Sequence, residues 1–271
     1  MKQSKQISRE ELQRKYHQNL VFNYSEYPTL DHWDFNYRSN DYSKSLVEWL
    51  KKNPEKNIFF YVHIPFCEQL CWFCTCSKFI TKSYGLVKEY MPYLHKEIDL
   101  LFNLLKENNI KLNVKTLYFG GGSPTILNRK DLKELVDKLK SYFDFSKINE
   151  FTIETDPRRV DEDRLLYNHK VCGTNRISFG MQDFDAEVQR RVNRVQPYEI
   201  FDKLLTKEVR KAYKTIAFDL LIGQPGQTKT TMEDTCDKII ELKPTLVQTS
   251  LMAYKPWINK APIRMVEDGP L

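Results

Sequence analysis

The strongest constraint on the fold is a repeated alternation of short apolar runs with segments of helical periodicity. Six runs rich in β-branched and aromatic residues have the length of strands, and they lie at 57–66, 115–121, 150–157, 175–182, 215–223 and 246–254. Between them, apolar residues recur three and four positions apart at 86–107, 129–143, 197–214 and 228–244. This alternation predicts an α/β fold, a partial parallel (β/α)6 barrel over 57–256. A doubly wound open sheet is the alternative, because one sequence does not reveal strand order.

The two ends of the chain do not follow this repeat. Residues 1–56 are polar and aromatic, and we expect an N-terminal extension that packs on the core. Residues 257–271 have no clear period. The sequence therefore predicts one repetitive α/β core with a short region on either side of it.

Polar residues and glycines follow five of the predicted strands. These features are the cysteine loop after the first strand, Gly120–Ser123 after the second, Glu154 and Asp156 at the third, Gln182 and Asp183 at the fourth, and Asp219 within the fifth. In parallel α/β folds ligands bind where strands end and the following loops begin, so this edge is the predicted active site. A plainer interpretation stays open for Asp156, which would cap a turn, and for Gln182–Asp183, which would cap a helix near Asp185.

The cysteine loop is the most specific chemical signal. Cys67, Cys71, Cys74 and Cys76 lie within ten positions, and the first three form a C-x3-C-x2-C pattern. Several thiolates from one short loop are typical of an iron–sulfur cluster, whereas zinc sites usually split their ligands between two separated pairs. Zinc is the alternative. His63, two residues before a proline, is more typical of a hydrogen-bonded strand residue than of a metal ligand.

Composition narrows the cellular setting and the partners. The formal net charge is +6 without a dense Lys/Arg tract, so we expect no nucleic-acid partner. The N-terminal MKQSKQISREEL has no apolar core of a secretory signal, and no run of about 18 apolar residues predicts a membrane span. We therefore expect a cytoplasmic protein, where clustered cysteines are metal ligands more often than disulfides.

An ordered set of longer motifs extends this interpretation. It runs from about residue 23 to 257 and comprises NYSEYPT, YVHIPFCEQLCWFCTC, FGGGSPT, IETDPR, NRISFGMQDFDAEVQRRVNR, DLLIGQPGQT and AYKPW. With these motifs the chain resembles the radical S-adenosylmethionine superfamily, and within it the oxygen-independent coproporphyrinogen III oxidase family. The resemblance implies the partial barrel of that superfamily as the fold.

The resemblance also implies site residues. Cys67, Cys71 and Cys74 would hold a 4Fe–4S cluster, and Cys76 matches an additional cysteine that is not a ligand. The implied contacts of a first S-adenosylmethionine are Tyr61, Gly121 and Glu154. The implied contacts of a second S-adenosylmethionine are Phe73, Gly122, Ser123, Gln182, Arg194, Asp219 and Ala253. No residue of the chain is assigned a catalytic role.

The activity implied by the resemblance is the oxidative decarboxylation of coproporphyrinogen III to protoporphyrinogen IX by a 5′-deoxyadenosyl radical, in haem synthesis. It implies a small-molecule tetrapyrrole substrate, an electron donor such as a flavodoxin or ferredoxin, and a monomer. One alternative is a haem-binding chaperone; proteins of that kind usually lack a cysteine at the position of Cys76. The other is a radical tetrapyrrole methyltransferase or a haem-degrading relative.

A few positions depart from the family pattern. Ser123 stands where threonine is usual, Tyr254 where histidine is common, and Asn23 where some members have arginine. Family members continue past AYKPW into a helical C-terminal domain, whereas this sequence ends at Leu271. We therefore expect a complete cofactor site and only the start of a truncated C-terminal region at 257–271.

Overall fold

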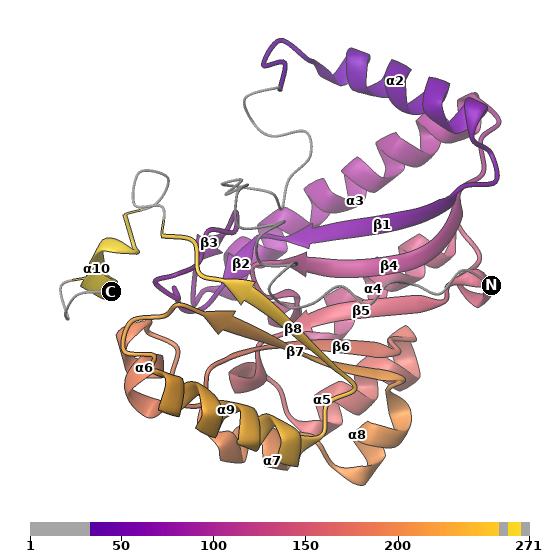
Figure 1. Ribbon diagram of the computed structural model, residues 1–271. Coiled ribbons are helices and arrows are strands. Elements are labelled where there is room, and N and C mark those ends of the chain that lie inside the picture. Colours follow the sequence, from indigo (N-terminus) through magenta and orange to yellow (C-terminus); the bar gives the residue numbers. More distant parts are fainter. Residues whose placement is uncertain (1–32, 255–259, 267–271) are drawn as a thin grey trace, which may run out of the picture. The chain divides into compact units, whose positions relative to one another are not determined.

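The computed structural model describes residues 33–254 and 260–266 (Figure 1). The motif NYSEYPT, Asn23 and the end of AYKPW lie outside the described residues. The chain divides between Trp49 and Leu50 into two compact units. Helix α2 (Ser39–Lys52) begins in the first unit, with Asp41 in its first turn and Lys51 and Lys52 in its last, which complements the helix dipole. The sequence prediction contains no helix here, because few apolar residues interrupt this polar segment.

The centre of the second unit is a six-stranded sheet in which all strands are parallel. Its order is β1-β4-β5-β6-β7-β8, the same order as in the chain. The strands are β1 (Asn57–Ile64), β4 (Asn113–Gly121), β5 (Glu150–Thr155), β6 (Arg176–Gln182), β7 (Thr215–Ile222) and β8 (Leu246–Leu251). A doubly wound sheet reverses direction at a switch point, and this sheet does not, so the predicted α/β fold with barrel-like winding is confirmed. Within the described residues β1 and β8 each pair with one neighbour only, so the sheet is open.

The remaining elements connect these strands. The helices are α3 (Tyr84–Glu107), α4 (Arg129–Lys140), α5 (Glu162–Tyr167), α6 (Ala186–Arg191), α7 (Tyr198–Leu204), α8 (Lys207–Ala212), α9 (Lys229–Leu242) and α10 (Ile263–Val266). Short helical turns are η2 (Pro124–Ile126), η3 (Phe145–Lys147), η4 (Pro157–Arg159) and η5 (Asn168–Cys172). A small pair of strands, β2 (Phe66–Cys67) and β3 (Phe79–Ile80), closes the base of the cysteine loop.

The two faces of the sheet differ in character. Ile177, Phe179 and Phe218 point to the outer face and are buried against Phe201 of α7 and Ile239 of α9. Figure 1 shows α7, α8 and α9 together on that side. Because side chains alternate along a strand, the next residues point to the inner face. That face carries polar groups, among them Ser178 and Asp219.

Two helical segments depart from the sequence prediction. The single helix predicted at 197–214 is two helices, because α7 ends at Leu204 and Thr206 starts α8 by accepting a hydrogen bond from the backbone N–H of Val209. Helix α5 is not among the predicted helices, since only six residues form it. Asp185 caps α6, close to the helix start expected from the sequence.

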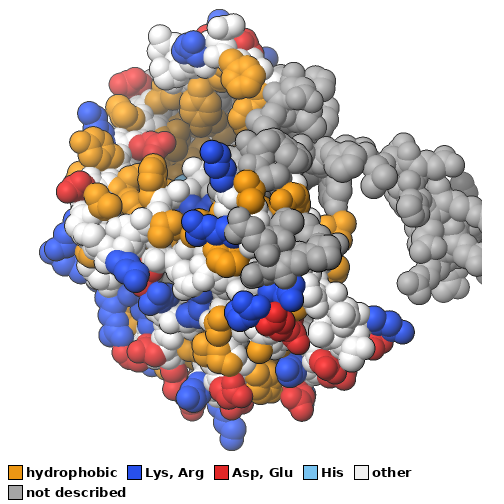
Figure 2. Space-filling model, turned by 90° about the vertical axis from the view of Figure 1, so that its left-hand side faces the viewer, with side chains coloured by type: hydrophobic (Ala, Val, Ile, Leu, Met, Phe, Trp, Pro, Cys, Tyr) orange, Lys and Arg blue, Asp and Glu red, His pale blue; other side chains and the backbone are white. Residues whose placement is uncertain are grey.

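Figure 2 views the molecule from the side where the strands end, and Lys and Arg side chains there are mixed with Asp, Glu and apolar ones.

Of the helices in the described ranges, none has both the length and the apolar composition that crossing a bilayer would require.

Candidate cofactor-binding site

A cavity of about 240 Å³ opens at the carboxyl ends of the strands, inside the curve of the sheet. Its lining residues are Cys67, Gln69, Cys71, Phe73, Cys74, Cys76, Lys78, Gly121, Gly122, Ser123, Glu154, Thr155, Asp156, Arg158, Ser178, Gly180, Gln182, Arg194 and Asp219. The structure therefore brings together all of the predicted site residues except Tyr61 and Ala253. Sequence positions more than 150 residues apart meet here because parallel strands deliver their ends to one edge of the sheet.

The cysteine loop is held at both its base and its tip. At the base, the backbone N–H of Thr81 donates to the carbonyl of Cys67 at 2.8 Å. At the tip, the Asn193 side chain donates to the carbonyl of Leu70 at 2.7 Å, and the backbone N–H of Trp72 donates to Val192 at 3.0 Å. The loop is thus fixed by the segment that follows α6, which the sequence alone does not reveal.

Three cationic side chains contact the cysteine loop. Cys71 is buried, and its Sγ lies 3.3 Å from Nη1 of Arg194 and 4.0 Å from Nη2 of Arg158. Lys78 donates from Nζ to the carbonyl oxygens of Cys74 and Cys76 at 2.9 and 3.0 Å. Positive groups of this kind favour the thiolate, which is the form of cysteine that binds metals.

The thiols of the loop differ in their protonation. A hydrogen bond with the Cys76 side chain lowers the pKa of Cys74 to about 6, and the same bond, with burial, raises the pKa of Cys76. Burial, together with the neighbouring Cys74 and Cys71, raises the pKa of Cys67 to about 12. Of Cys67, Cys74 and Cys76, Cys74 therefore carries charge most readily, and Cys76 is the proton donor beside it.

The arrangement fits a cluster better than a single ion. In the described ranges, no three His, Cys, Asp or Glu side chains converge as ligands of one metal ion would. A 4Fe–4S cluster does not need that convergence, because each cysteine binds a different iron atom. Cys67, Cys71 and Cys74 instead surround one cavity from a single loop. The donor set therefore fits such a cluster, with one iron left for another ligand.

Glycines 120–122 are required for space as well as for conformation. Gly121 has φ +116, and a Cβ on it would lie 2.8 Å from the His63 ring. A Cβ on Gly122 would lie 2.6 Å from the carbonyl oxygen of Phe66, next to Cys67. The backbone N–H of Ser123 donates to that same oxygen at 2.7 Å. The end of β4 therefore packs directly on the cysteine loop without intervening side chains.

Two carboxylates face the cavity from β5 and β7, the strands on either side of β6. Glu154 accepts hydrogen bonds from the Tyr118 hydroxyl at 2.9 Å and from the backbone N–H of Gly121 at 3.1 Å. Asp219 accepts one from the Ser178 hydroxyl at 3.0 Å. Burial raises the pKa of both carboxyl groups. Each is held in place yet retains lone pairs that a ligand can use.

Tyr61 lies beside this cavity and does not line it. Its ring packs over Gly120, and its hydroxyl donates to Nδ1 of His63 at 2.9 Å. The donor direction follows from the other ring nitrogen, because Nε2 of His63 must donate to the carbonyl of Ser77, 2.9 Å away. His63 is thus the hydrogen-bonded histidine that the sequence favoured, and it ties β1 to the cysteine loop.

Arg158 is a site residue that the sequence analysis missed. It donates from Nε to Asp156 at 2.8 Å and from Nη2 at 2.6 Å. Burial alone would raise the pKa of Asp156, but the bonds from Arg158 and the charge of Arg194 hold it below its usual value. Asp156 also accepts from the backbone N–H of Arg158, so its expected capping role and its place in the site are both present. The motif IETDPR contains Arg158, but the motif alone does not indicate that the Arg158 side chain points into the cavity.

The end of β6 is irregular. The pairing of β6 with β7 shifts between Phe179 and Gln182, and Gln182 has φ +69. A bulge of this kind turns a side chain away from its regular position, here into the cavity. Arg194 reaches the same place, where its Nη2 donates to the carbonyl of Gly180 at 2.6 Å. Arg194 therefore positions Cys71 and this bulge together.

Ala253 lies just beyond β8, is exposed, and is not among the residues that line the cavity. Its predicted role as a ligand contact has no counterpart in the described geometry and stays a prediction.

Comparisons with known proteins identify the family of the chain. Residues 61–239 match the sequence profile of the radical SAM superfamily. The oxygen-independent coproporphyrinogen III oxidase of Escherichia coli is 34% identical over 249 residues, 92% of this chain and 52% of that protein. That of Helicobacter pylori is 32% identical over 240 residues, 88% of this chain and 51% of that protein.

Solved structures support the same family assignment. Coproporphyrinogen III oxidase (HemN) from Escherichia coli, described as a radical SAM enzyme, superposes with a TM-score of 0.81 at 32% identity over 92% of this chain and 56% of that one. A radical S-adenosylmethionine methyltransferase from Kitasatospora setae, TsrM, shares the fold with a TM-score of 0.52 at 15% identity. The chain spans about half the length of the curated relatives it matches. On its sequence, its sheet and its cysteine loop, the chain belongs to the radical SAM superfamily.

Proposed function

We propose that the protein takes part in the oxygen-independent oxidative decarboxylation of coproporphyrinogen III to protoporphyrinogen IX. One observation carries the proposal. The three cysteines of one loop open onto a cavity that also contains Glu154 and Asp219, in a chain more than 30% identical to curated oxidases of that name. The substrate is then a tetrapyrrole with propionate side chains, and the core that binds the cofactors is residues 57–256.

The chain's own residues have distinct parts in this function. Cys67, Cys71 and Cys74 hold a 4Fe–4S cluster, which, with S-adenosylmethionine bound to it, supplies the 5′-deoxyadenosyl radical. Glu154, held by the backbone N–H of Gly121, would accept hydrogen bonds from the amino group of that S-adenosylmethionine. The protein contributes by binding, orienting and excluding water.

A second S-adenosylmethionine would be bound by residues from several parts of the cavity wall. Gln182 ends β6, Asp219 lies within β7 and Arg194 lies in the loop after α6. Gly122 and Ser123 directly follow Gly121 of β4, and Phe73 belongs to the cysteine loop. Asp219 suits ribose hydroxyl groups. Arg194 already contacts Cys71 and Gly180, so a ligand carboxylate there would have to share its guanidinium.

The proposed reaction needs an electron donor and an electron acceptor. Cleavage of S-adenosylmethionine would consume one electron, for which a flavodoxin or ferredoxin is the proposed donor. Each propionate would lose one hydrogen atom to the 5′-deoxyadenosyl radical and one electron to a one-electron acceptor as carbon dioxide leaves. The proposed oligomeric state is a monomer.

The proposal is tested by anaerobic reconstitution of the protein with iron and sulfide. Reduction in the presence of S-adenosylmethionine should then yield 5′-deoxyadenosine, and added coproporphyrinogen III should lose carbon dioxide. Cys74→Ala should abolish both, and Cys236→Ala on α9, outside the cavity, should abolish neither. Absence of 5′-deoxyadenosine from the reconstituted protein would refute the radical chemistry. Formation of 5′-deoxyadenosine with only methyl transfer to a tetrapyrrole would refute the proposed reaction.

A further inference from the structure

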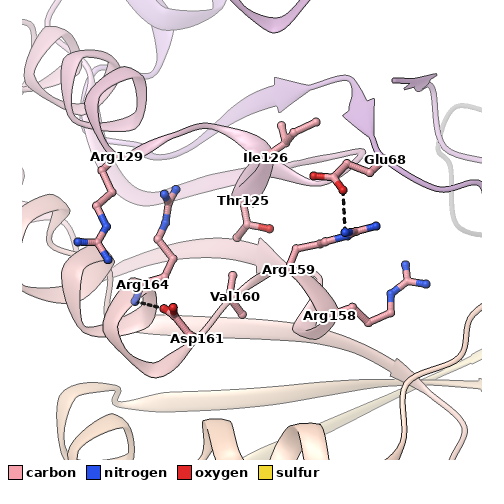
Figure 3. A pocket seen from close by; sticks show the side chains of 9 residues that line it. All are labelled: Glu68, Thr125, Ile126, Arg129, Arg158, Arg159, Val160, Asp161 and Arg164. Atoms are coloured by element: carbon pink, nitrogen blue, oxygen red, sulfur yellow. Dashed lines mark hydrogen bonds and ion pairs between the residues drawn. The ribbon is translucent and has the colours of Figure 1, made fainter. Parts of the chain in front are cut away.

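A second, larger pocket lies on the other side of the loops that form the cofactor cavity. Its volume is about 590 Å³, and four arginines line it, from η4 and from the starts of α4 and α5 (Figure 3). Arg158 lines both spaces. This volume is within the range of pockets that bind small molecules. The cofactors of the proposed function do not use it.

Three of these arginines are already paired with carboxylates. Arg159 binds Glu68 at 2.8 Å, and Arg158 binds Asp156 at 2.6 Å. Arg129 binds Asp163, with both side chains largely exposed. An exposed pair of this kind is weak, so another anion can compete for Arg129 at little cost.

Arg164 differs from the other three. One of its terminal nitrogens donates to the carbonyl of Leu127 at 2.5 Å. Among the described residues no carboxylate is paired with this guanidinium, and its Nε is buried without a hydrogen-bond partner. The Asp161 side chain accepts a hydrogen bond from the backbone N–H of Arg164 at 2.7 Å, not from its guanidinium group. A partly buried cation without a counter-charge is costly, and a bound anion would offset that cost.

Arg129 and Arg164 share one end of the pocket. Figure 3 shows both guanidinium groups on that side, whereas Arg159 points toward Glu68. Burial lowers the pKa of Arg164, and the charge of Arg129 lowers it further. These two guanidinium groups repel each other across an open space. Each can donate two parallel hydrogen bonds to the oxygens of a phosphate or carboxylate group, so an anion between them would be bound by both.

We propose that this pocket is a binding site for a small oxyanion, a phosphate or polycarboxylate compound, held between Arg129 and Arg164. The site is separate from the cofactor cavity, and its existence does not depend on the proposed reaction. Glu68 of the cysteine loop lines the pocket and is paired with Arg159, so the ligand would lie in a space that the cysteine loop helps to form.

Calorimetric titration of the full chain at low salt tests the proposal, with inorganic pyrophosphate in one arm and citrate in the other. We expect at least one of them to bind, with an affinity that falls as salt is added. Arg164→Met should weaken binding by about tenfold or more, as expected for loss of a charge-assisted hydrogen bond, and Arg164→Lys by less. The matched control is Arg210→Met on α8, where Arg210 likewise donates to main-chain carbonyls, and it should bind as the parent does.

The two arms separate the possible ligands, because preference for pyrophosphate indicates a phosphate compound and preference for citrate a polycarboxylate. If Arg164→Met does not fold, as judged by circular dichroism, Arg129→Gln at the exposed side of the pocket takes its place and should also weaken binding. Failure of both anions to bind at millimolar concentration would overturn the proposal. Equal affinity in the parent and in the folded variants would overturn it as well.

Discussion

Replacing Gly122 by alanine tests the packing of β4 against the cysteine loop. The added Cβ would lie 2.6 Å from the carbonyl oxygen of Phe66, whereas ordinary contacts begin at 3.4 Å. The loop must therefore move by several tenths of an ångström, close to Cys67. Its backbone carbonyl cannot rotate away freely, because it accepts the hydrogen bond from Ser123.

The expected costs follow from that displacement. Overpacking of a well-packed interior costs about 1–3 kcal/mol of unfolding free energy. A misplacement approaching 1 Å at a reacting centre can cost about 100-fold in rate. Gly122→Ala should therefore lose much of its reconstituted iron and sulfide, and should form 5′-deoxyadenosine at least about tenfold more slowly than the parent.

Gly173→Ala is the matched control. Gly173 has φ +89, so alanine there is strained by roughly 1–2 kcal/mol, but nothing lies within 4 Å of the added Cβ. It should lose stability in urea unfolding and keep its full iron content and rate. Gly122→Ala with the iron content and rate of the parent would refute the steric reasoning. An equal loss of iron in both variants would show that stability, and not loop position, is responsible.

Three further outcomes are expected. Cys67→Ala should lose the cluster absorbance after reconstitution and Cys76→Ala should keep it; loss in both would make Cys76 a ligand. Phe218→Ala should lower the free energy of unfolding in urea by about 3–5 kcal/mol, because the ring is fully buried against Phe179 and Phe201, and a loss below about 1 kcal/mol would contradict that packing. Burial and the charge of Lys138 lower the pKa of His95 from 6.5, so the unfolded chain binds the proton more readily and stability should fall as pH drops below about 6.5. His95→Gln should flatten that fall in unfolding measured from pH 8 to about pH 5, and an unchanged pH profile would contradict the assignment.

The sequence was informative wherever local pattern and global fold coincide. Five of the six predicted strands contain an observed one, and β4 begins at Asn113, two residues before the predicted 115–121. Glu154 and Asp219 reach the cavity because parallel strands end at one edge. The cysteine spacing indicated the chemistry directly, because the loop ligands are local in the chain. These features depend on hydrophobic period and on spacing, both of which are visible in a single sequence.

Other features depend on contacts that no local pattern encodes. The break between α7 and α8 at Thr206 interrupts a continuous helical period, and the bulge at Gln182 depends on pairing with β7. Arg158 looks like any solvated arginine until Asp156 and Cys71 are placed next to it. Tertiary packing decides these cases, and it overrides local propensity.

The two unlike faces of the sheet also bear on how such a protein can change over time. Phe218 and Asp219 are neighbours in the chain, yet one secures the hydrophobic core and the other faces the cavity. The same division separates Ile177 from Ser178 and Ile153 from Glu154. Substitutions that alter ligand preference can therefore accumulate at every second position of a strand while the intervening positions preserve the scaffold. One fold can in this way serve lineages with different chemistry, since its architecture and its reactivity are inherited through separate sets of residues.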